Sequence, residues 1–199
     1  MQRILIVCLL LASAMASAEI FVVPHFMAEG YALCELLPAA LAGLSADGRP
    51  IHLCRPVGAN PRLSGLLSAA ALRTCGERRW ASRDTTLLVM GHGTPRNPAS
   101  AATAISHAED IARAGCFGAV EVAFLDQAPS LPAVLERLTT RHAVVVGFFA
   151  DRGSHGEKDV PRLLAESPVS AAYAGPIGTS DEIPDLILDQ VFAELAPVS

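Results

Sequence analysis

Residues 85–195 show a regular alternation of short apolar runs and helical patterns, and this alternation constrains the fold more than any other feature of the chain. Each apolar run is followed within two residues by glycine or aspartate, which is typical of a buried strand that ends in a loop. The expected strands are Leu87–Met90, Ala119–Leu125, Ala143–Phe149 and Ala171–Ala174, and the expected helices are Ala99–Ala114, Leu131–Leu138, Asp159–Glu166 and Ile183–Leu195. Four successive strand–helix units predict an α/β fold, with a parallel sheet covered by helices on both faces.

The first part of the chain repeats the last part. Residues 20–43 align with residues 143–166 without a gap, and residues 55–67 then align with residues 175–187. The alignment places matching residues on each other: Gly30 on Gly153, Pro38 on Pro161, Pro56 on Pro176 and Gly58 on Gly178. Such self-similarity indicates a duplicated unit. We therefore predict two lobes, an incomplete N-terminal lobe over residues 1–80 and a complete C-terminal lobe over residues 84–199, joined by a polar connection near Cys75–Asp84.

The N-terminus supports two interpretations. Residues 1–18 have the basic start, short apolar core and Ala16–Ala18 cleavage site of a secretory signal peptide, which would make the protein exported. Alternatively, Ile4–Val7 is a strand and Leu9–Ala18 a helix, together the remnant of the missing front of the first lobe. The repeat register favours the second interpretation, so we expect residues 4–18 to be folded in and the protein to be cytoplasmic. The apolar core is too short to span a bilayer as a helix, and we expect no membrane association.

Composition argues against nucleic acid as a partner. The 199 residues carry a net charge of −5, the isoelectric point is about 5.6, and only 5% of residues are aromatic. Neither a basic patch nor a set of stacking aromatic residues is evident. The five cysteines are scattered, with no CxxC pair, which fits free thiols in a reducing compartment.

Two histidines follow strands of the C-terminal lobe. His92 lies between two glycines directly after Leu87–Met90, and His155 lies in the loop after Ala143–Phe149. In a flavodoxin-like strand order, 2-1-3-4, these two strands are neighbours and their carboxyl ends flank the crevice where ligands bind. Asp126, which follows the second strand, opens onto the same edge. We expect His92, His155 and Asp126 to lie close together.

Two imidazoles and a carboxylate can hold a divalent metal ion, or they can remove protons near neutral pH. A purely structural role for the two histidines is the alternative. The other histidines are expected to be structural: His25 at the lobe interface, and His52, His107 and His142 at the surface or hydrogen-bonded inside the fold.

The segments VMGHGTP, VAFLDQAPSL, VVVGFFADRGSHGEKDVP and AGPIG together resemble the sirohydrochlorin cobaltochelatase and ferrochelatase family of CbiX/SirB type. The resemblance implies a chelatase fold of flavodoxin-like lobes and the insertion of Co²⁺ or Fe²⁺ into a tetrapyrrole, sirohydrochlorin or a related macrocycle. By position, His92 and His155 match the metal-facing histidines of that family. Asp126 stands where the family commonly has Glu, and the front of the N-terminal lobe is missing.

Such a tetrapyrrole carries acidic side chains and is held between lobes or subunits, so a homodimer is one expected assembly. Arg96 and Arg152 are candidates to pair with the substrate carboxylates. Two other functions stay open at this point. One is a non-catalytic metal-binding or tetrapyrrole-binding protein derived from a chelatase. The other is a histidine phosphatase, which would need an Arg beside the nucleophilic His, where this chain has Gly91.

Overall fold

A four-stranded parallel sheet forms the larger half of the molecule in the computed structural model, which describes residues 6–11, 19–42, 49–94, 99–167 and 169–196. Its strand order is β5-β4-β6-β7, so the predicted order 2-1-3-4 is confirmed. The strands are β4 (Thr85–Gly91), β5 (Ala119–Phe124), β6 (His142–Gly147) and β7 (Ser170–Pro176). All three pairings are parallel, which brings the carboxyl ends of β4, β5 and β6 to one edge.

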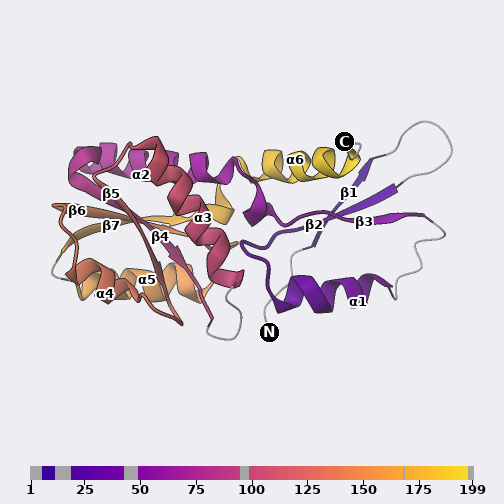
Figure 1. The fold of residues 1–199 in the computed structure, drawn as a ribbon, viewed down its shortest axis with the longest axis horizontal. Coiled ribbons are helices and arrows are strands. Elements are labelled where there is room, and N and C mark those ends of the chain that lie inside the picture. The colour runs from indigo at the N-terminus through magenta and orange to yellow at the C-terminus, as the bar shows by residue number, and fades with distance from the viewer. Residues whose placement is uncertain (1–5, 12–18, 43–48, 95–98, 168, 197–199) are drawn as a thin grey trace.

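Helices cover both faces of this large sheet (Figure 1). On one face lie α2 and α3, and on the other lie α4 and α5. Their bounds are α2 Leu63–Arg78, α3 Ala99–Ala114, α4 Leu131–Glu136 and α5 Val160–Ala165. The middle strand β4 is buried along its whole length, as its uninterrupted apolar run predicts.

A second, smaller sheet has the strand order β1-β2-β3, with β1 (Ile6–Leu11), β2 (Glu19–Pro24) and β3 (Ile51–Leu53). β2 and β3 are parallel, like their counterparts β6 and β7 in the repeat. β1 pairs with β2 in the antiparallel direction, in the place that β4 occupies beside β6. The predicted helix Leu9–Ala18 is therefore wrong over Leu9–Leu11, because apolar residues there complete a sheet edge; residues 12–18 lie outside the described residues.

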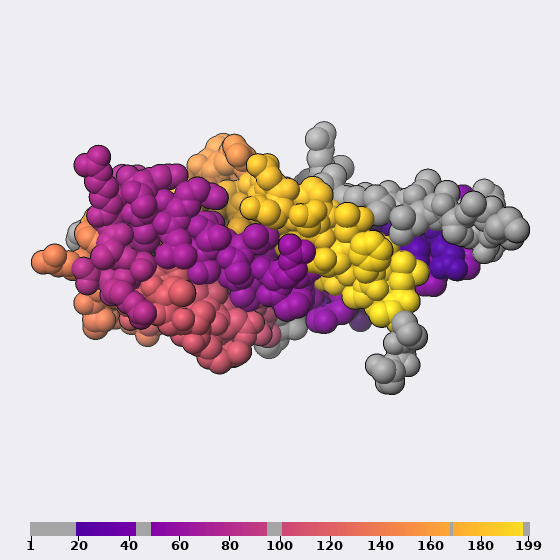
Figure 2. Space-filling view, turned by 90° about the horizontal axis from the view of Figure 1, so that it is seen from above, coloured from indigo at the N-terminus to yellow at the C-terminus, as the bar shows by residue number. Residues whose placement is uncertain are grey.

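Two helices cross between the sheets. α2 follows β3 of the small sheet yet packs on β6 and β7 of the large one, and α6 (Ile183–Leu195) follows β7 yet packs on β2. Seen from above, α2 and α6 lie one after the other on the same side of the molecule (Figure 2). Asp189 of α6 pairs with Arg62 at 2.7 Å, just before α2 begins. The two sheets thus contribute side chains to one apolar core. The predicted division into two lobes, residues 1–80 and 84–199, stays a prediction.

The predicted connection Cys75–Asp84 is wrong at its start, because α2 continues to Arg78. Cys75 is buried against the large sheet, so the helix gains apolar contacts by extending into the predicted connection. Arg79 then adopts a left-handed conformation and ends the helix. Trp80 follows and stacks on His142 with ring centres 4.4 Å apart.

The repeat is visible in the backbone as well as in the sequence. β2 is followed by the π-helical segment η1 (Ala32–Leu36) and α1 (Leu37–Ala42), and β6 is followed by the π-helical segment η4 (His155–Asp159) and α5. η1 and η4 occupy aligned positions. Aligned hydrogen bonds also join the two strand-end loops of each copy: Gly58 donates to Phe26 O at 2.9 Å, and Gly178 donates to Phe149 O at 3.0 Å.

Among the helices of the described residues, none has the length and apolar content needed to cross a membrane.

Candidate functional site

His92 and His155 meet at the carboxyl edge of the large sheet, as the strand order predicts. His92 directly follows β4, and His155 opens η4 after β6. Their ring centres are 4.8 Å apart and the ring planes are tilted by 45°. The centre of the Phe149 ring lies 6.5 Å from that of His155. We refer to His92 and His155 as the histidine pair.

Backbone contacts hold Asp126 beside His92. The carbonyl oxygen of His92 accepts from the N–H of Leu125 at 3.1 Å and from the N–H of Asp126 at 3.0 Å. Gly93 has a φ of +68°, and a Cβ there would lie 2.5 Å from the Gln127 side chain. Glycine at this position therefore lets the backbone after His92 lie against Gln127, the residue that follows Asp126. The Asp126 carboxylate ends 3.4 Å from His92 Nε2. The predicted grouping of His92, His155 and Asp126 is therefore present.

A second carboxylate, which was not predicted, belongs to the group. Asp159 Oδ2 lies 2.8 Å from His155 Nδ1, across one turn of η4. The start of η4 is shaped by Asp151, whose carboxylate accepts from the Gly153 N–H at 2.8 Å. Asp159 stands in the GSHGEKDVP segment that carries the family resemblance, and its i, i+4 spacing from His155 was the available signal.

The separation of the histidine pair suits a shared metal ion. Two imidazoles that bind one ion at metal–nitrogen distances of about 2.1 Å have ring centres roughly 4.5–5.3 Å apart for angles at the metal of about 90–110°. The observed 4.8 Å lies inside that range. The neighbouring carboxylates of Asp126 and Asp159 add negative charge, which favours the approach of a divalent cation.

The group is open rather than enclosed. Side-chain exposure runs from 35% for Asp159 to 59% for Asp126, so a large ligand can reach every member. Within the described ranges, no three His, Cys, Asp or Glu side chains form a ready-made metal site. Two imidazole ligands leave the remaining coordination positions of an ion free for donors from a second molecule.

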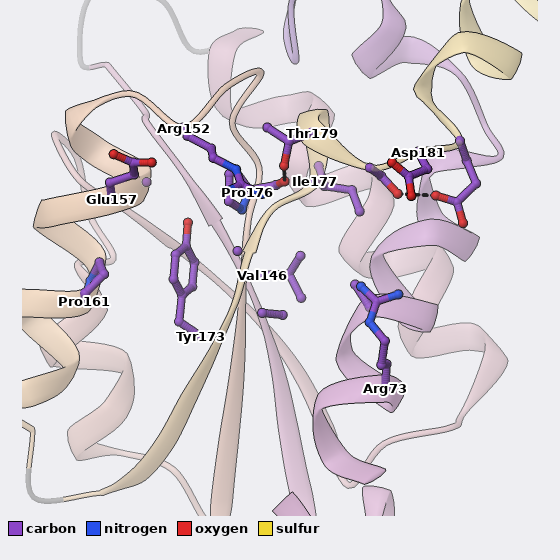
Figure 3. Close-up of a pocket in the computed structure, with 16 residues that line it drawn as sticks. Arg73, Val146, Arg152, Glu157, Pro161, Tyr173, Pro176, Ile177, Thr179 and Asp181 are labelled. Carbon is purple, nitrogen blue, oxygen red and sulfur yellow. Dashed lines mark hydrogen bonds between the residues drawn. The ribbon is translucent and has the colours of Figure 1, made fainter. Parts of the chain in front are cut away.

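A pocket of about 840 Å³ lies next to η4, along the edge strand β7 (Figure 3). Arg152, predicted to bind substrate carboxylates, lines it together with Arg73 of α2 and Tyr173 of β7. Burial raises the pKa of Tyr173 to about 12, so its hydroxyl stays protonated and can donate a hydrogen bond. Arg73 and Tyr173 were not predicted. Arg96, the other predicted arginine, lies outside the described residues.

The remaining histidines have structural surroundings. His107 is buried and bonded at both nitrogens, to Ser64 Oγ at 2.8 Å and to the Gly58 carbonyl at 2.7 Å, as expected of a hydrogen-bonded core histidine. Burial lowers the pKa of His25, while the nearby Asp151 carboxylate and a hydrogen bond to the Gly178 backbone act in the opposite direction. His25 directly follows β2 of the small sheet, and these two partners follow strands of the large sheet, so His25 lies at the interface as predicted.

A parallel four-stranded sheet and a smaller mixed sheet exchange the helices that follow their last strands, and two histidines lie at the carboxyl edge of the larger sheet. These features define a chelatase-type fold. A solved structure described as CbiX, the terminal enzyme for biosynthesis of siroheme in denitrifying bacteria, is similar with a TM-score of 0.74 and 27% identity. The match covers 90% of this chain and 76% of that one. SirB from Bacillus subtilis with Fe³⁺ matches with a TM-score of 0.72 over 88% of this chain and 71% of its own; at 15% identity it bears on the fold alone.

The chain belongs to the CbiX family, whose sequence profile matches residues 8–74 and 86–194. A probable sirohydrochlorin cobaltochelatase of Halobacterium salinarum is 30% identical, over 92% of this chain and 74% of that protein. A sirohydrochlorin cobaltochelatase of Methanocaldococcus jannaschii is 27% identical, over 53% of this chain and 96% of its own length. The resemblance stated from sequence motifs is confirmed.

Proposed function

We propose that the protein is a tetrapyrrole metal chelatase, an enzyme of the lyase class, which inserts a divalent metal into sirohydrochlorin or a related macrocycle. The observation that carries the proposal is the histidine pair, 4.8 Å apart and open to solvent at the carboxyl edge of the sheet. Membership of the CbiX family and the names of its relatives support the same chemistry.

Metal insertion requires the removal of water from the ion and of two protons from pyrrole nitrogens. We assign His92 and His155 as the ligands that receive the ion and as acceptors of pyrrole protons. Asp126, 3.4 Å from His92, is the further acceptor that carries a proton away from that ring. Arg152 would pair with a carboxylate at the periphery of the macrocycle, through bidentate hydrogen bonds. Arg96 is proposed for the same role.

The test is direct insertion. Purified protein is mixed with sirohydrochlorin and either Co²⁺ or Fe²⁺, and the visible absorption of the macrocycle is followed against a reaction without protein. We expect the protein to accelerate insertion of one or both ions. Histidine and carboxylate ligands suit cobalt and iron alike, so the comparison of the two rates chooses the metal.

A non-catalytic binding protein is the second candidate, and the incomplete small sheet is the observation that favours it. β1 runs antiparallel to β2, so the small sheet lacks the fully parallel arrangement of the large one. If the protein binds sirohydrochlorin or Co²⁺ but does not accelerate insertion, a binding function replaces the proposed chelatase activity.

We propose a cytoplasmic location, because β1 pairs with β2 over Ile6–Leu11 and cleavage after Ala18 would remove that partner. Mature protein that begins at Glu19 in an exported fraction would contradict this proposal. Homodimer formation also stays a prediction, which sedimentation at several protein concentrations tests, and the expected lack of nucleic-acid and membrane binding stays one too.

A further inference from the structure

We infer that Asp159 is a positioning residue: its carboxylate holds His155 in the tautomer whose Nε2 is free and aims that nitrogen toward the metal. The inference rests on the proposed chelatase function for its purpose, and on the contact between Asp159 Oδ2 and His155 Nδ1, 2.8 Å long, for its geometry.

The tautomer follows from hydrogen-bond chemistry. A carboxylate has only acceptor atoms, so the ring nitrogen in contact with it must carry the hydrogen. With the hydrogen on Nδ1, a neutral imidazole keeps its lone pair on Nε2, the nitrogen that remains to bind an ion. A metal-binding histidine commonly donates its other N–H to a carboxylate, which fixes the ring orientation and strengthens the ligand.

Local packing makes Asp159 suited to this role. It lies one turn after His155 on the π-helical segment η4, and it directly precedes Val160, which is completely buried. The backbone that carries the carboxylate is therefore anchored to the core, although the side chain itself is 35% exposed. Asp126 does not share the role, because it contacts His92 through Nε2 and at the longer distance of 3.4 Å.

The repeat supplies an internal comparison. On the aligned π-helical segment η1, Ala32 takes the place of His155 and Leu36 takes the place of Asp159. Leu36 is 48% exposed and carries no carboxylate, yet η1 is π-helical like η4, so this segment forms without a carboxylate at that position. Both members of the contact are absent together in the copy that has the same backbone, as expected if the carboxylate serves the histidine.

The experiment compares the wild-type protein with Asp159→Asn, free of metal and macrocycle, after labelling the histidine rings with ¹⁵N. Two-bond ¹H–¹⁵N correlation spectra at mildly alkaline pH report which ring nitrogen of His155 carries the hydrogen. We expect the Nδ1–H form to dominate in the wild type. In Asp159→Asn the amide can donate to Nδ1, so we expect a large shift toward the Nε2–H form.

Co²⁺ affinity without macrocycle is the second readout, and we expect Asp159→Asn to weaken it by about 10-fold or more. Asp159→Glu keeps a carboxylate and should restore part of both properties. Glu157→Gln removes a neighbouring charge of η4 and Asp126→Asn removes the carboxylate at His92; neither should change the His155 tautomer.

A wild-type His155 mainly in the Nε2–H form, or an unchanged tautomer in a folded Asp159→Asn variant, would overturn the inference. Because the spectra need no turnover, these outcomes are distinct from a failure of the chelatase proposal, which would appear as a normal tautomer shift in a protein without insertion activity.

Discussion

The described parts of residues 20–72 and residues 143–195 have the same order of elements and differ in the side chains that these elements carry. Both copies have a strand, a π-helical segment, a helix and a parallel partner strand in the same order. Only the second copy carries His155 and Asp159, and only the large sheet supplies His92 from a neighbouring strand. The comparison teaches that the π-helical segment belongs to the scaffold, and that the chemistry depends on a few side chains added to it.

The largest expected effect comes from removing the two histidines that the small sheet lacks at the matching places. His92→Ala and His155→Ala should each lower the rate of metal insertion by roughly 100-fold or more, because each removes a ligand and proton acceptor. Both side chains are about half exposed, so stability should change by roughly 1 kcal/mol or less. The double variant should lose little more than the worse single one, since the pair acts as a unit.

Insertion rates are measured in variants matched for thermal stability. His52→Ala is the control, because His52 lies on β3 of the small sheet and stacks on Phe21. It should keep nearly the full rate. Rates close to wild type in both variants of the histidine pair would show that the pair is structural.

The next effect tests what the copies share. A Cβ on Gly58 would lie 1.9 Å from the Met27 carbonyl oxygen, and one on Gly178 would lie 2.5 Å from the Ala150 carbonyl oxygen. Gly58→Ala and Gly178→Ala should therefore each lower the free energy of unfolding by about 2–3 kcal/mol, as overpacking of a rigid site does.

Urea unfolding measures these changes, with Gly65→Ala as the control. Gly65 lies within α2 and has open space around it, so alanine there should raise the free energy of unfolding by about 0.5–1 kcal/mol. Unchanged stability in either Gly58→Ala or Gly178→Ala would mean that the shared loop contact does not matter to folding.

Asp126→Ala should have a smaller effect than loss of either histidine. Its carboxylate is 3.4 Å from His92 Nε2 and 59% exposed, so water can replace part of its role. We expect insertion to slow by about 10-fold. Asp126→Glu, which lengthens the side chain, should equal or exceed the wild-type rate; a loss as large as that of His92→Ala would assign Asp126 a more direct role.

The smallest expected effect concerns His25, which stands where the other copy has Phe148. Burial lowers the pKa of His25 in the folded state from its ordinary value of 6.5, so the unfolded chain binds the proton more readily. Its contribution to stability is thus present above pH 6.5 and is lost as the pH falls below that value.

His25→Phe should reduce the decrease in melting temperature between neutral and mildly acidic pH. Thermal unfolding monitored by circular dichroism at the two pH values measures that decrease, and the pH dependence due to other groups cancels in the comparison with wild type. An identical decrease in both proteins would contradict the assigned cause.

Much of this arrangement can be predicted from the sequence. The strand order, the meeting of His92, His155 and Asp126, and the family all follow from apolar runs, the repeat and short motifs. The direction of β1 could not, because an apolar run of six residues pairs equally well in either direction until its partner is known. The extension of α2 to Arg78 depends on burial of Cys75 against a distant sheet, which no local pattern records.

The role of Asp159 was missed for a related reason. Its spacing from His155 suits a contact on any helix, but whether the carboxylate reaches Nδ1 depends on the π-helical turn, which appears only in the folded backbone. Arg73 joins the pocket beside η4 because α2 crosses to the other sheet, so its position too depends on tertiary structure.

The central claim is that His92 and His155 receive the metal together. A crystal structure of the protein soaked with Co²⁺, with anomalous differences measured at the cobalt edge, tests it most directly. We predict one peak between the two rings, at about 2.1 Å from a nitrogen of each. A cobalt peak on other side chains, with none between these two rings, would contradict the account.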